Sequence, residues 1–193
     1  QALAVKNIVG FDLREDRRNE TFEKYDIIVV SRFEDAISSF KFDTFIISLP
    51  PDIHHIYMKK ALELSIPAFI EASVIDTDFE EMIAKSKERR VCLAPSCTLF
   101  FHPAIKKIAE IIKNGDLGTV SNFLYHSGQY LPDWHNYEDV SEYYVSNKET
   151  GGGREIVPFE LTWITLVLGF PKRVVGLYKN TIQIKGAELI DDT

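Results

Sequence analysis

Short runs of apolar residues, separated by helical segments, constrain the fold of this chain most strongly. The runs are continuous rather than alternating, which indicates strands buried on both faces. Strands of this kind that alternate with helices predict a doubly wound α/β domain with a parallel sheet, here over residues 1–95. The predicted strands are residues 7–12, 27–30, 44–49, 68–70 and 91–93, and the helical segments between them are about 13–24, 34–40, 52–64 and 79–87.

The second half of the chain has a different pattern. Residues 103–114 carry isoleucines on one helical face, and Gly115 follows as a typical helix C-cap. A polar loop rich in aromatic residues precedes an apolar helix at about 155–168. We therefore predict an α+β domain over residues 96–193, with an open, largely antiparallel sheet that is incomplete within this sequence. Its predicted strands are 120–126, 174–178 and 181–185.

Composition narrows the classes of partner. The net charge of −7 and pI near 5.3 argue against a nucleic acid or an anionic membrane as partner. No apolar run approaches the roughly 18 residues of a membrane span. Cys92 and Cys97 have no cysteine or histidine neighbours at zinc-site spacing, so we expect no metal site and two reduced thiols in a cytoplasmic protein. The chain opens at Gln1 and runs almost at once into a strand, so we expect that a first strand and a Gly-rich turn are missing.

Polar or turn-forming residues follow the predicted strands. They are Asp12, the turn at 48–51, Glu71 with Ala72, and residues 94–96. Ligands of open α/β sheets bind beyond the carboxyl ends of the strands, so these residues are candidates for a binding site. An acid after an early strand can bond the ribose of a dinucleotide, as Asp12 would here. Acids also start turns, so a structural interpretation of Asp12 stays open.

The stretch FDTFIISLPPDIHHIYMKKALELSIPAFIEAS resembles the core of the glucose–fructose oxidoreductase / inositol dehydrogenase (Gfo/Idh/MocA) family. The resemblance rests on SLPP at 48–51, His54, ALE at 61–63 and EAS at 71–73. Further matches cover nearly the whole chain. They are FHP at 101–103, GDLG at 115–118, GGG at 151–153 and LGFP at 168–171.

The resemblance implies an N-terminal NAD(P)-binding Rossmann domain, a C-terminal substrate domain, and hydride transfer on a sugar or cyclitol. It also implies a homodimer or homotetramer that pairs through the C-terminal sheet. The acid at Asp12 favours NAD because a 2′-phosphate would meet a like charge, whereas Arg14 leaves room for NADP. The residues implied for the cofactor are Asp12, Leu13, Arg14, Ser48, Leu49, Pro50, Pro51, His54, Glu71 and Ala72.

The sequence departs from the family at the positions that move protons. The family's lysine falls on Ala72, and the acid, histidine and second acid of its substrate helix fall on Glu155, Phe159 and Thr162. Only Glu155 keeps an ionisable side chain. Oxidation of a sugar alcohol still needs a group that takes the hydroxyl proton, so we expect a relocated acid/base.

The loop HSGQYLPDWHNYEDVSEYY at 126–144 offers side chains for this role and for binding a sugar. Its aromatic residues could equally pack against the sheet or a partner subunit. The proton-transfer candidates of the loop are His126, Tyr130, Asp133, His135, Tyr143 and Tyr144. We predict Glu155, His126 and Tyr130 as the catalytic residues. The predicted substrate-binding residues are Gln129, Asp133, Trp134, His135, Arg154 and Phe159.

Three functions stay open at this stage. The first is an NAD(P)-dependent oxidoreductase of a sugar or sugar derivative; a nucleotide-linked or acidic sugar would have its charge faced by Arg154 or Lys148. The second is a catalytically silent protein that binds a dinucleotide or a sugar on the same fold, which the loss of three expected catalytic groups favours. The third is a structural subunit that uses the open sheet for association.

Overall fold

The computed structural model describes residue 5 and residues 7–192, and it divides into two compact units, Gln1–Asp43 and Thr44–Thr193. The first unit contains β1 (Val9–Phe11), α1 (Glu15–Tyr25), β2 (Ile28–Val30) and α2 (Phe33–Ser39). Its two strands pair in parallel, with Val9 opposite Ile28. This unit therefore has the strand–helix–strand pattern that the sequence predicts.

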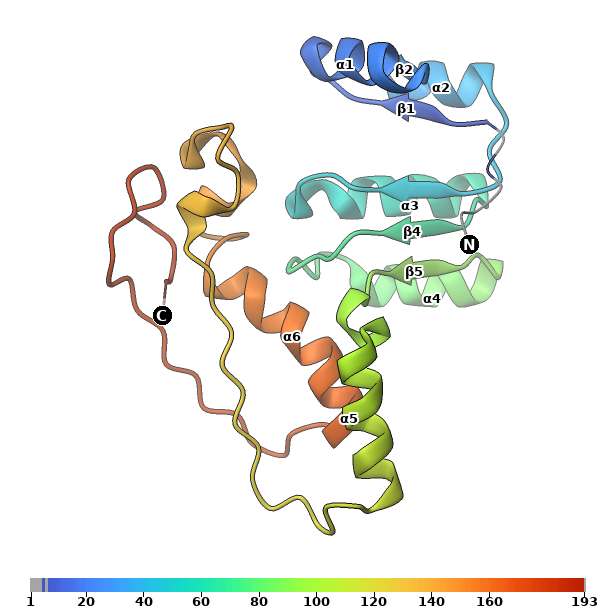
Figure 1. Ribbon diagram of the computed structural model, residues 1–193. Coiled ribbons are helices and arrows are strands. Elements are labelled where there is room, and N and C mark those ends of the chain that lie inside the picture. The colour runs from blue at the N-terminus through green and yellow to red at the C-terminus, as the bar shows by residue number, and fades with distance from the viewer. Residues whose placement is uncertain (1–4, 6, 193) are drawn as a thin grey trace. The chain divides into compact units, whose positions relative to one another are not determined.

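The sheet of the second unit consists of β3 (Phe45–Ile47), β4 (Ala68–Ile70) and β5 (Leu93–Pro95), all parallel and in that order. The helices α3 (His54–Leu64) and α4 (Phe79–Arg89) cover one face of it, side by side (Figure 1). The core between sheet and helices confirms the predicted parallel α/β arrangement. Its buried members are Ile47, Met58, Ala61, Leu62, Ala68, Ile70, Met82 and Val91.

The two faces of this sheet differ. Ile47 and Ile70 point into the core, but their neighbours Ile46 and Phe69 lie on the opposite face and are 75% and 43% exposed. Successive side chains of a strand alternate between faces, so one face of the sheet is left open to solvent. Burial on both faces, predicted from the continuous apolar runs, is therefore wrong for β3 and β4 as the structure describes them.

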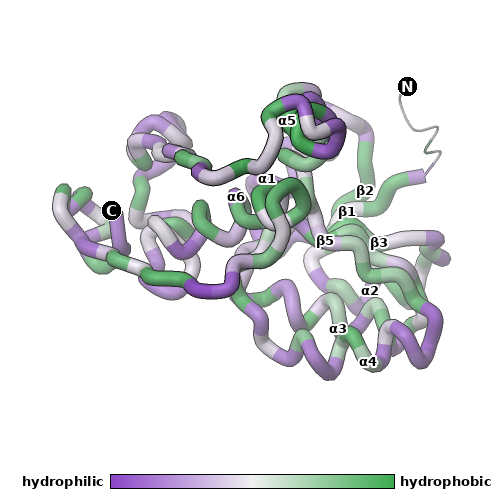
Figure 2. The backbone as a smooth tube through the Cα atoms, turned by 90° about the horizontal axis from the view of Figure 1, so that it is seen from below, coloured by the Kyte–Doolittle hydropathy of each residue, from purple (hydrophilic) through white to green (hydrophobic). Residues whose placement is uncertain are grey.

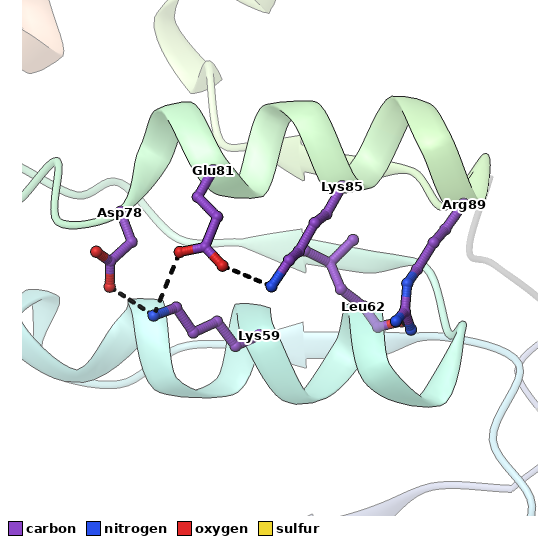
Figure 3. A network of polar contacts seen from close by, with 6 residues as sticks. All are labelled: Lys59, Leu62, Asp78, Glu81, Lys85 and Arg89. Carbon is purple, nitrogen blue, oxygen red and sulfur yellow. Dashed lines mark hydrogen bonds and ion pairs between the residues drawn. The ribbon is translucent and has the colours of Figure 1, made fainter.

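A row of charged side chains joins α3 to α4 (Figure 3). Lys59 on α3 bonds Asp78 at 2.6 Å and lies 4.0 Å from Glu81, which in turn bonds Lys85 at 2.5 Å. Arg89 closes the row by donating to the backbone oxygen of Leu62 at 2.9 Å. These groups are solvent-accessible, so each contact contributes little to stability, and the row links the exposed sides of the two helices.

The rest of the second unit contains α5 (Pro103–Asn114) and α6 (Gly153–Leu168), which contact one another. Gly115 ends α5 with φ of +75°, as the sequence predicts. Figure 2 shows hydrophobic and hydrophilic segments alternating along α3 and α4, as expected of helices with one buried side.

The predicted antiparallel strands are not present in the part of the chain that the structure describes. Residues 120–126, 174–178 and 181–185 form no ladder there. Several of their apolar side chains are exposed, among them Leu124 at 92% and Leu177 at 92%. A strand needs a neighbouring strand to pair with, and none of these segments forms a ladder among the described residues, so their apolar pattern alone does not produce a sheet.

Within the described residues, every helix is too short or too polar to cross a membrane. Cys92 and Cys97 are both free thiols.

Candidate functional site

A cavity of about 800 Å³ opens between the carboxyl ends of β4 and β5, the helix α4 and the helix α6. This volume lies within the range of small-molecule sites in proteins. Apolar side chains such as Met82 and Leu93 line one side, and Phe159 and Thr162 of α6 line the other. All of its walls belong to the unit Thr44–Thr193.

Glu155 and Tyr144 meet in this cavity. The Tyr144 hydroxyl donates to Oε1 of Glu155 at 2.5 Å. Burial raises the pKa of the Glu155 carboxyl, while the Tyr144 hydrogen bond and the nearby His135 act in the opposite direction. Burial, and then the bond to Glu155, also raises the pKa of Tyr144, so the phenol keeps its proton and donates it as a hydrogen bond. The pair is a carboxylate of increased basicity held in place by a neutral phenol.

Two glycines place Glu155 at the start of α6. A β-carbon on Gly151 would lie 1.7 Å from the backbone oxygen of Val145, and one on Gly152 would lie 2.2 Å from the backbone oxygen of Asp191. Gly152 also has φ of +62°, which favours glycine. The chain can pass between residues 145 and 191 only because these side chains are absent, and α6 begins directly afterwards.

Tyr144 is positioned by its own neighbours. It begins a short 3-10 helix, Tyr144–Ser146, whose Val145 is fully buried. The buried hydroxyl of Thr150 donates to the Tyr144 backbone oxygen at 2.6 Å. These contacts fix the backbone from which the phenol reaches Glu155.

A second carboxylate of α6, Glu160, also borders the cavity, but the protein satisfies it. Ser127 donates to its Oε1 at 3.0 Å, and the indole N–H of the buried Trp163 donates to its Oε2 at 2.8 Å. Tyr125 makes a further hydrogen bond to it. Glu160 therefore holds the 120–127 segment against α6 and has little capacity left for a ligand.

Glu71 reaches the cavity from the end of β4. It is exposed, and its Oε1 accepts the backbone N–H of Ala72 at 3.0 Å. Its charge contributes to the raised pKa of Tyr144, which places it in the same electrostatic environment as Glu155. The cavity thus has an acid from β4 and an acid–phenol pair that joins α6 to the preceding loop.

The turn after β3 is held by His54. This side chain is 1% exposed, and its Nε2 lies 2.6 Å from the backbone oxygen of Leu49. Its Nδ1 has no hydrogen-bond partner among the described residues. Burial lowers the pKa of His54, so the neutral ring donates from Nε2 and fixes the turn, leaving Ser48 and Pro50 exposed.

In the first unit, Asp12 follows β1. Its carboxylate accepts the backbone N–H of Arg14 at 2.8 Å, a contact that starts the turn into α1. The Arg14 side chain bonds Asp16 and holds the pKa of that carboxyl near 2, below its usual value. Asp12 therefore has the turn-forming role that acids at strand ends often have. Leu13 beside it is 77% exposed.

The structure brings some of the predicted site residues together. Glu155, Gln129, Trp134, Phe159, Pro51, Glu71 and Ala72 line the cavity. His126, Asp133 and His135 are absent from its lining, and so is Tyr130, which borders a second, smaller hollow with Asp139 and Lys185. Arg154 pairs with Glu149 at 3.2 Å instead.

Several lining residues did not stand out in the sequence. Tyr144 was one of six similar candidates in an unpatterned loop, and the α4 residues Phe79, Met82 and Lys87 belong to an ordinary amphipathic helix. Glu160 carries a signal that could have been used, because an acid in the middle of an apolar helix needs a partner. Its partner Trp163 is three residues further along the same helix, but Ser127 lies 33 residues away, so the sequence alone does not reveal that second contact.

No protein-family model matches the sequence, and no curated protein matches it. Several solved structures, in contrast, match the structure of this chain. An oxidoreductase from Agrobacterium radiobacter in complex with NAD⁺, L-tartaric acid and magnesium superposes with a TM-score of 0.69 and 14% identity, over 83% of this chain and 46% of that one. The myo-inositol 2-dehydrogenase from Lactobacillus plantarum superposes with a TM-score of 0.54 and 17% identity, over 60% and 35%.

The WlbA dehydrogenase from Bordetella pertussis, solved with NADH and UDP-GlcNAcA, matches with a TM-score of 0.53 and 13% identity, over 57% of this chain and 35% of that one. The chain thus spans between a third and a half of these structures. At such identities the likeness concerns the fold. The chain therefore has the fold of dehydrogenases of the glucose–fructose oxidoreductase / inositol dehydrogenase type, which confirms the resemblance found in the sequence.

Proposed function

We propose that this chain belongs to an NAD-dependent oxidoreductase that acts on a sugar or sugar derivative, with Glu155 as the relocated acid/base and Tyr144 as its partner. The observation that carries the proposal is the Tyr144–Glu155 pair in a ligand-sized cavity at the carboxyl ends of parallel strands. Solved structures of the same fold hold NAD⁺ or NADH, and one also holds the sugar derivative UDP-GlcNAcA.

The residues at the strand ends suit a dinucleotide. The turn that His54 fixes presents the exposed Ser48 beyond β3, and Glu71 follows the neighbouring strand β4. Asp12, beyond β1 of the first unit, is the proposed ribose partner, with Leu13 and Arg14 beside it. The acid favours NAD over NADP. When bound, the cofactor would supply the hydride acceptor.

The protein's own part is proton transfer. Tyr144 takes Oε1 of Glu155, and among the described residues nothing bonds Oε2. A substrate hydroxyl that donates to Oε2 would pass its proton to Glu155 as hydride leaves the carbon. The raised pKa brings this carboxyl closer to working pH, which is what a general base needs. Trp134 and Phe159 supply apolar surface for a ring.

We further propose a domain organisation, a C-terminal sheet and an oligomeric state. We place the cofactor domain at residues 1–95 and the substrate domain at 96–193, and we expect the segments 174–178 and 181–185 to join an antiparallel sheet. That sheet would pair subunits into a homodimer or homotetramer. We also expect a cytoplasmic protein, in keeping with its free thiols.

A titration of the full-length protein with NADH and with NADPH tests the proposal. NADH should bind more tightly than NADPH, Asp12→Ala should weaken binding, and Glu155→Gln should leave it unchanged because Glu155 serves the substrate. Failure of the wild-type protein to bind either nucleotide would refute the oxidoreductase. Nucleotide binding without turnover of any sugar or cyclitol would favour the silent binding protein.

A further inference from the structure

Acidic side chains outnumber basic ones in the lining of the cavity. Glu71, Glu155 and Glu160 line it, and Lys87 is the one basic residue among the lining residues that the structure describes. Within the same residues, none of the three acids forms an ion pair with a lysine or an arginine. The carboxylates are therefore not neutralised by the protein.

Two of these acids are available to a ligand. Glu160 is occupied by Ser127, Trp163 and Tyr125. Glu71 and Glu155 each have one described hydrogen bond, to Oε1, from Ala72 and Tyr144 respectively. They come from different elements, the end of β4 and the start of α6, and the charge of Glu71 acts on Tyr144, the partner of Glu155, so a ligand in the cavity would meet both acids.

Aromatic side chains make up a second, independent part of the site. Trp134, Phe159 and Tyr144 line the same cavity. The face of an aromatic ring attracts cations. It also offers apolar surface on which the apolar face of a sugar ring can pack. Carboxylates and aromatic rings together favour a ligand that is both hydroxylated and positively charged.

We infer that the substrate is an amino sugar or a related hydroxylated ring that carries an ammonium group, and that rings with a carboxylate are rejected. The inference rests on the proposed function, since it takes this cavity as the substrate site. It replaces the expected acidic sugar, because Arg154 is paired with Glu149 and neither Arg154 nor Lys148 lines the cavity. Like charges at short range in a partly desolvated site disfavour binding.

The test compares glucosamine, glucose and glucuronate as ligands of the full-length protein without nucleotide, by ligand-detected NMR at a pH where the amine is protonated. Glucosamine should bind about tenfold more tightly than glucuronate, with glucose between them. Glu71→Gln and Glu155→Gln should each reduce this ratio. Glu88→Gln, which removes an exposed acid of α4 outside the cavity, should leave it unchanged.

A ratio near one, tighter binding of glucuronate, or no binding of any of the three would overturn the inference. An equal fall of the ratio in Glu88→Gln would overturn it too, because net charge rather than the cavity would then be responsible. Because nucleotide is absent, the result is separate from the NADH titration: charge selectivity without nucleotide binding would refute the oxidoreductase and leave the ligand class standing.

Discussion

The start and the middle of α6 each carry a glutamate, and the two carboxylates differ in the number of hydrogen bonds that they accept from the protein. At the start of the helix, Glu155 receives one hydrogen bond, from Tyr144, and burial raises its pKa. One and a half turns further on, Glu160 receives bonds from Ser127, Trp163 and Tyr125. A carboxylate that is fully bonded by its own protein stabilises the fold, whereas one that is half-buried and accepts a single hydrogen bond is available for chemistry. The comparison gives Glu160 a structural role and supports the proposed catalytic role of Glu155.

The largest expected effect comes from the glycine that delivers Glu155. Gly152→Ala should lower the free energy of unfolding by at least about 1–3 kcal/mol, because it combines a positive φ with a close approach to the Asp191 backbone oxygen. Urea unfolding measures it. Gly153→Ala is the matched control, since its added carbon would meet only Asp191 at 3.6 Å. Equal stability of the two variants would show that the approach to residue 191 does not position α6.

The next effect separates the two acids directly. Glu160→Ala should cost about 1–3 kcal/mol of stability, because the indole N–H of the buried Trp163 loses its acceptor. Glu160→Gln keeps an oxygen acceptor and should cost less. Both are measured by urea unfolding. If Glu155→Ala destabilised the protein as much as Glu160→Ala, the division between structural and catalytic acid would be wrong.

A smaller effect concerns the phenol. Tyr144→Phe removes the hydrogen bond that lowers the pKa of Glu155, so that pKa should rise further. The acidic limb of the kcat/KM profile should therefore move to higher pH, with activity reduced about tenfold at pH values below the new pKa. Tyr143→Phe is the control, because the Tyr143 hydroxyl bonds the Leu131 backbone oxygen instead. An unmoved limb in Tyr144→Phe would exclude Glu155 as the titrating base.

The smallest effect concerns the buried His54, whose Nδ1 has no hydrogen-bond partner among the described residues. The pKa of His54 is lowered from 6.5 by burial, so the unfolded chain binds a proton more readily than the folded one. Stability should therefore be full above pH 6.5 and fall as the pH drops below it. His54→Leu should lack this dependence, whereas a variant of the exposed His126, His126→Gln, should keep it. A wild-type stability that is flat between pH 7 and pH 5 would contradict the buried neutral ring.

Sequence patterns predicted the regular part of this molecule well. Continuous apolar runs predicted β1 to β5, and Glu155 was a candidate because it is the one ionisable residue left at the positions where the family moves protons. The loop 126–144 has no period, so nothing distinguished Tyr144 from His126 or Tyr130 until the structure showed which one reaches Glu155. The segments 174–178 and 181–185 have strand-like patterns, but pairing depends on a neighbour that local sequence does not specify.

We propose that Glu155 takes the hydroxyl proton of the substrate in a nicotinamide-dependent oxidation. Single-turnover reduction of NAD⁺ by an amino sugar or cyclitol substrate, compared between wild type and Glu155→Gln, tests it most directly. The rate should be lower by about 10²–10⁴-fold in the variant, with nucleotide affinity and stability retained. A variant that reduces NAD⁺ as fast as the wild-type protein would contradict it.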